Sequence, residues 1–105
     1  MSKFEEVAVK QLRPGAALEV YTRNTKYFLE IIDPMQLVVK VSGGWVERLN
    51  VDAVLCYLLE ETLRAGQSMN LIPVNSVSFQ FLDGRIRCTS PVQKIELVRI
   101  GFVFI

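Results

Sequence analysis

Apolar and polar residues alternate along most of this 105-residue chain, in short stretches separated by turn residues. Alternation of this kind places apolar side chains on one face of a strand and polar side chains on the other, so it predicts half-buried β-strands. The 14 Val, 7 Ile and 4 Thr residues support this interpretation, because branched side chains are stiff and pack well on a pleated surface. About seven short strands are expected, at 18–22, 27–32, 36–41, 45–49, 77–81, 85–89 and 95–100.

Turn sequences join these stretches. Asp83-Gly84 is the strongest hairpin signal, because a two-residue hairpin turn needs a positive φ that Gly adopts without strain. Further turns are expected at 14–15, 33–34 and 90–91, and a hairpin at 42–44 leading into the stretch at 45–49. Short strands in tight hairpins predict a small β-barrel-like domain, open or closed. The length fits a single domain covering residues 1–105.

The spacing of apolar residues changes in the middle of the chain. Over 51–65 they recur at helical intervals, Asn50 is a suitable N-cap, and Gly66 follows the last turn. One helix is therefore expected near 51–65, and the fold is mainly β, or α+β if this helix forms. A buried strand over 53–59 followed by a loop is the alternative. Residues 2–11 fit either a brief strand or a helical turn.

The residue types argue against catalysis. The chain has no His, so both the usual general base near neutral pH and the commonest metal ligand are missing. The sequence contains no phosphate-binding glycine motif, no calcium-loop motif and no Ser-x-x-Lys motif. Twelve basic residues against eleven acidic ones give no overall field that attracts nucleic acid or anionic lipid. We therefore expect no enzyme activity, no catalytic residue, no cofactor and no metal.

Cys56 and Cys88 lie far apart in the sequence and form no Cys-x-x-Cys motif, which predicts two reduced interior thiols. No stretch reaches the length of an apolar membrane span. Residues 1–12 lack the basic start and apolar run of a secretory signal. These features predict a cytoplasmic protein without a membrane partner.

Several stretches resemble a group of small bacterial proteins of unknown function. They are Leu12-Arg-Pro-Gly15, Leu18-Glu-Val20, Thr22-Arg-Asn-Thr25 with Tyr27, Leu29-Glu-Ile-Ile-Asp33 and Thr89-Ser-Pro-Val92. The shared residues cover about half of the chain, and the segment 51–70 departs from the pattern. The resemblance implies a bacterial, cytoplasmic domain, and it carries no catalytic residue with it.

The apolar content favours a function that depends on surface contacts. Half of the residues are apolar, and a small domain cannot bury every large side chain. Our first hypothesis is a non-enzymatic domain that binds a protein partner or forms a homo-oligomer. Trp45, Val46, Phe102 and Phe104 are the candidate interface residues, because apolar residues near a sheet edge are costly to expose.

The alternative hypothesis is a single-stranded RNA-binding β-barrel module. Tyr21, Arg23, Lys26 and Tyr27 place two aromatic and two basic side chains around one turn, a combination with which small barrels bind single strands. Acidic residues such as Glu19 are interleaved with them, and cross-strand ion pairs on a solvated face explain the pattern without a ligand. Nucleic acid is therefore the less favoured partner.

Overall fold

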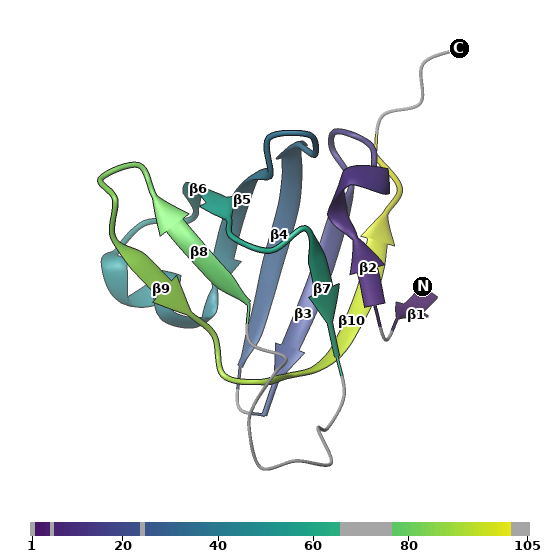
Figure 1. The fold of residues 1–105 in the computed structure, drawn as a ribbon. Helices are drawn as coiled ribbons and strands as arrows, with labels where there is room; N and C mark the ends of the chain where they lie inside the picture. The colour runs from purple at the N-terminus through teal and green to yellow at the C-terminus, as the bar shows by residue number, and fades with distance from the viewer. Residues whose placement is uncertain (1, 5, 24, 66–76, 102–105) are drawn as a thin grey trace.

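The computed structural model describes residues 2–4, 6–23, 25–65 and 77–101 (Figure 1). The mainly β fold expected from the sequence is confirmed, and the helices in these ranges are two short 3-10 segments. The elements are β1 (Ser2–Phe4), β2 (Glu6–Ala8), η1 (Val9–Gln11), β3 (Ala17–Thr22), β4 (Lys26–Asp33), β5 (Val38–Gly43), η2 (Gly44–Leu49), β6 (Val54–Leu58), β7 (Thr62–Arg64), β8 (Ser78–Phe81), β9 (Ile86–Cys88) and β10 (Val92–Arg99).

Eight strands form one antiparallel sheet in the order β1-β10-β3-β4-β5-β6-β8-β9, and β2 pairs with β7 in a second sheet. Among the described strands, β1 and β9 end the large sheet and do not pair with each other, so its ladder of hydrogen bonds is open. The β2–β7 pair lies in front of β3 and β10 in Figure 1. Val7 of β2 and Leu63 of β7 are buried in one core cluster with Leu18 and Leu29 of the large sheet. The small sheet therefore covers the inner face of the large one.

The alternating stretches form strands as expected. Along β3 and β4 the residues of the apolar series are buried, and the register pairs Leu18 with Leu29 and Val20 with Tyr27. The Asp83-Gly84 hairpin is confirmed, since Gly84 has a φ of +90° between β8 and β9.

The helix expected over 51–65 is wrong. Val54–Leu58 is strand β6, which pairs with β5 on one side and β8 on the other, and Thr62–Arg64 is strand β7. The alternative of a strand near 53–59 was the better interpretation. Inside β6, Cys56 and Leu58 are buried while Leu55 is exposed, a period of two that the helical spacing concealed. The hydrogen bonds and packing that β6 gains from β5 and β8 stabilise the strand more than the local apolar spacing favours a helix.

The strand expected over 45–49 is also wrong, because these residues form the 3-10 helix η2. Gly43 and Gly44 lead into it with φ values of +81° and +53°. A Cβ at Gly43 would lie 2.5 Å from the carbonyl oxygen of Lys26, and a Cβ at Gly44 would overlap the ring of Tyr27. The two glycines therefore let the chain turn tightly against β4 instead of continuing as a strand.

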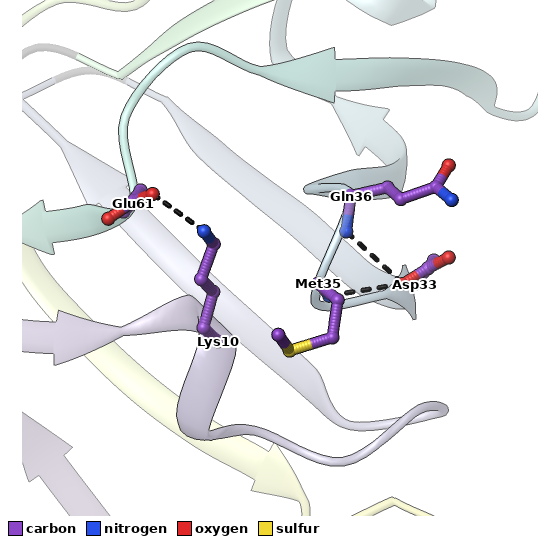
Figure 2. A network of polar contacts seen from close by, with 5 residues as sticks. All are labelled: Lys10, Asp33, Met35, Gln36 and Glu61. Carbon is purple, nitrogen blue, oxygen red and sulfur yellow. Dashed lines mark hydrogen bonds and ion pairs between the residues drawn. The ribbon is translucent and has the colours of Figure 1, made fainter.

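Polar contacts hold η1 against the loop that precedes β7. Figure 2 shows the ion pair between Lys10 and Glu61. Lys10 Nζ lies 2.7 Å from Glu61 Oε1, and the Val9 N–H donates to the Glu61 carbonyl at 2.8 Å. In the turn after β4, the Asp33 side chain accepts hydrogen bonds from the N–H groups of Met35 and Gln36. This side-chain cap forms the turn expected at 33–34.

Candidate functional site

The candidate interface residues at 45 and 46 do not form an open surface. Val46 has an exposed fraction of 0%, which makes its assignment to a contact surface wrong. Trp45 is half-buried, and its ring lies 6.3, 6.1 and 5.3 Å from the ring centroids of Tyr27, Phe79 and Phe81. These side chains fill the core instead. Phe102 and Phe104 lie outside the described residues.

The proposed RNA-binding residues are divided between the two faces of the sheet. Tyr21 pairs with Lys26, and Val20 pairs with Tyr27, so the two tyrosines point to opposite faces. Tyr27 is buried, while Arg23 is exposed. The structure thus does not bring Tyr21 and Tyr27 together as an aromatic platform. The sequence contained this signal, because Tyr27 belongs to the apolar series of its strand and Tyr21 to the polar one.

A polar cluster occupies the outer face of β3, β4 and β10 around Tyr21. Lys94 Nζ lies 4.1 Å and Lys26 Nζ 5.9 Å from the centroid of the Tyr21 ring. Lys26 also lies 3.6 Å from Glu19, and Lys94 lies 3.1 Å from Glu96. The two cations and two carboxylates of this cluster therefore balance in charge, so these four side chains offer no net positive charge to a phosphate backbone.

The Tyr21 hydroxyl donates a hydrogen bond to the Glu19 carboxylate. This bond, followed by desolvation and the charges of Glu19 and Glu96, raises the pKa of Tyr21 to about 12. The phenol stays protonated at neutral pH and is already engaged as a donor.

The two cysteines have different environments, and only one is the interior thiol that the sequence suggested. Burial raises the pKa of Cys56 to about 11, which makes its thiolate scarce at neutral pH. Cys88 is exposed, so the interior assignment is wrong for this residue. Its sulfur lies 3.2 Å from the Ser78 hydroxyl on the neighbouring strand. Both thiols are free.

An open apolar groove lies at the corner where β6, β8 and the end of η2 meet, and its volume is about 550 Å³. We define the apolar groove by its lining residues, which are Leu49, Val51, Ala53, Val54, Leu55, Phe81, Leu82, Asp83 and Arg85. Leu82 is 69% exposed, and Leu49, Val51 and Leu55 are each more than 40% exposed. Four large apolar side chains therefore meet water at one concave site.

Sequence reasoning missed this groove. The helical spacing over 51–65 predicts Val51 and Leu55 on the buried stripe of a helix, whereas the structure has no helix there and leaves both exposed. Leu55 comes near Leu82 only because β6 pairs with β8, a contact between strands far apart in the sequence. No sequence signal marks Leu55 as exposed, because residues 54–59 are all apolar.

Strand β9 pairs with β8, which helps to line the apolar groove, and it is the last strand of the large sheet. All three of its residues are exposed. The Arg85 carbonyl accepts a hydrogen bond from the Phe81 N–H, and the Thr89 N–H donates to the Val77 carbonyl. The main-chain N–H and C=O groups of the odd-numbered residues of this segment therefore point towards β8. Because main-chain groups alternate sides in an antiparallel ladder, those of Ile86 and Cys88 point away from the sheet.

The part of the chain that the structure describes holds no cluster of three or more Cys, Asp or Glu side chains that could bind a metal ion. None of its helices is long and apolar enough to cross a membrane. Comparisons of the chain with protein-family models, with curated proteins and with solved structures found no match.

Proposed function

We propose that this chain is a non-enzymatic protein-binding domain and that the apolar groove is its contact site. The observation that carries the proposal is the convergence of four exposed apolar side chains, Leu49, Val51, Leu55 and Leu82, on one concave surface. Exposure of apolar surface to water is unfavourable, so a partner that covers these side chains lowers the free energy. Clustered exposed apolar patches typically mark interaction sites.

The charged residues beside the apolar side chains of the groove support the proposal that its partner is a protein. Asp83 and Arg85 lie at its edge, where the Arg85 Nε is 2.7 Å from an Asp83 oxygen. An apolar centre with a polar rim is the usual composition of a protein interface. A reducing, cytoplasmic setting is part of the proposal, because the two cysteines are free thiols.

A capture experiment with two matched variants tests this function. The groove variant Leu55→Ser/Leu82→Ser is compared with the control variant Met35→Ser/Ile100→Ser, whose residues are exposed to a similar degree away from the groove. Each tagged protein is immobilised at the same density and incubated with a lysate of the cells that produce it. A protein partner retained by the wild type and the control variant, and lost from the groove variant, is the expected result.

Two outcomes would contradict the proposal. Equal retention by the groove and control variants would show that the groove makes no contribution to binding. Tight binding of single-stranded RNA at low salt, lost in Arg23→Ala/Lys26→Ala, would favour the RNA hypothesis instead. Sedimentation of the wild type at high concentration separates a second copy of the chain from a different protein as the partner.

A further inference from the structure

We infer that the partner adds an extended strand to β9, and that this strand alternates apolar and acidic residues. The inference rests on the proposed protein-binding function and specifies the chemistry of the partner. Extended peptides commonly bind to exposed sheet edges, where main-chain hydrogen bonds provide affinity and alternate side chains provide specificity.

The first support comes from the backbone of β9. Ile86 and Cys88 direct their N–H and C=O groups away from β8, as the hydrogen bonds of Arg85 and Thr89 establish. Within the described ranges no strand pairs with this side of β9. Four main-chain groups of β9 thus have no strand partner among the described residues and could pair with an added strand.

The second support comes from the outer face of the sheet. The register places Tyr57, Gln80 and Ile86 in one row across β6, β8 and β9. Ile86 is 56% exposed and Tyr57 is also exposed. The neighbouring row contains Leu55 and Leu82 of the apolar groove. An apolar side chain of an added strand, placed beside Ile86, would extend this apolar surface.

The third support is the charge on the opposite face of β9. Arg87 is exposed, and none of the ion pairs among the described residues involves it. Arg85 precedes it on the same face, two residues away. Opposite charges on neighbouring strands attract, so an acidic residue is favoured beside Arg87.

The same arginines disfavour two of the registers in which a second copy of the chain could pair with this edge. In two-fold antiparallel pairs centred on Ile86 or on Arg87, Ile86 would lie opposite Ile86 or Cys88 of the other copy, whereas a pair centred on Cys88 would place Arg87 opposite Thr89. The first register places Arg87 opposite Arg85, and the second places Arg87 opposite Arg87. Like charges directly opposite each other are unfavourable, and charged edge residues commonly prevent such self-pairing.

Peptide binding to the full chain tests the inference. The probe is a fluorescent eight-residue peptide of alternating Val and Glu, and the control probe alternates Val and Lys. Arg87→Glu reverses the edge charge, and Arg23→Glu is the matched control at an exposed arginine away from β9. Melting curves of both variants confirm that they fold.

We expect fluorescence anisotropy to report binding of the Val-Glu peptide to the wild type and to Arg23→Glu. Arg87→Glu should weaken this binding by about tenfold and should favour the Val-Lys peptide, because attraction becomes repulsion. Amide exchange should slow at Ile86 and Cys88 when the Val-Glu peptide binds, since their N–H groups become hydrogen-bonded. A peptide in which the Val-Glu sequence is N-methylated at alternate residues should bind weakly.

Three results would overturn the inference: no binding of the Val-Glu peptide, equal effects of the two arginine variants, or binding that leaves amide exchange at Ile86 and Cys88 unchanged. Capture that depends on Leu55 and Leu82 would still stand in each case. The strand-addition inference would then fail while the proposed function survived. Loss of groove-dependent capture would instead remove the proposed function.

Discussion

Replacing Gly44 by Ala gives a direct test of how the chain turns from β5 into η2. Gly44 has a φ of +53°, and an added Cβ would overlap the Cε1 and Cζ atoms of the buried Tyr27 ring. Gly84 is the matched control, because its φ is +90° and a Cβ there would meet nothing within 4 Å. Both substitutions place an Ala side chain at a positive φ, which costs free energy in either case. Only the one at Gly44 also brings a Cβ against the Tyr27 ring.

The magnitudes follow from these two contributions. A left-handed conformation costs an ordinary residue about 1–2 kcal/mol, which is the expected loss of unfolding free energy for Gly84→Ala. Overpacking of a filled core adds about 1–3 kcal/mol at Gly44, so Gly44→Ala should lose about 2–5 kcal/mol. A domain of this size has a stability of about 5–15 kcal/mol, so the larger loss is readily measured.

Urea unfolding followed by Trp45 fluorescence measures both losses, because Trp45 is the only tryptophan and packs against Tyr27. Thermal unfolding should separate the two variants by on the order of 10 °C. An equal loss of stability in Gly44→Ala and Gly84→Ala would refute the reasoning, because it would mean that the Tyr27 ring moves aside without cost.

Three further predictions concern single side chains. Absorbance titration should show that the Tyr21 phenol ionises near pH 12, and Glu19→Gln should lower this pKa towards the ordinary value of 10.0. Because the raised pKa favours the protonated folded state, the contribution of Tyr21 to stability is intact below pH 10 and is lost as the pH rises towards 12. Iodoacetamide should modify Cys88 in the folded protein and Cys56 only after unfolding, as mass spectrometry of the alkylated chain will show; equal rates would contradict the burial of Cys56. Phe79→Ala should reduce the unfolding free energy by about 3–5 kcal/mol, since Phe79 is 1% exposed; a loss below about 1 kcal/mol would mean that the core collapses into the space.

Local sequence signals predicted the features that depend on nearby residues. The Asp83-Gly84 hairpin and the alternating strands β3 and β4 follow from turn chemistry and from a period of two. The segment 51–65 failed because its apolar spacing fits a helix locally, whereas β5 and β8 supply partners on both sides of β6.

The candidate site could not be predicted for a related reason. Leu55 and Leu82 become neighbours through a strand pairing that no local pattern encodes. Trp45 and Val46 are expected at a contact surface because apolar residues near a sheet edge are costly to expose, yet η2 directs both towards the core. The division of Tyr21 and Tyr27 between faces was available from the alternation, and only the turn between them suggested otherwise.

The position of β10 has a consequence for synthesis of the chain. β10 is the last described strand, and it lies between β1, the first strand, and β3. During translation, β3 to β9 are synthesised before β10. The edge of β3 that pairs with β10 therefore stays unpaired until β10 has been synthesised. Pairings between such distant segments form slowly, and the unpaired side is exposed to other nascent chains during that interval.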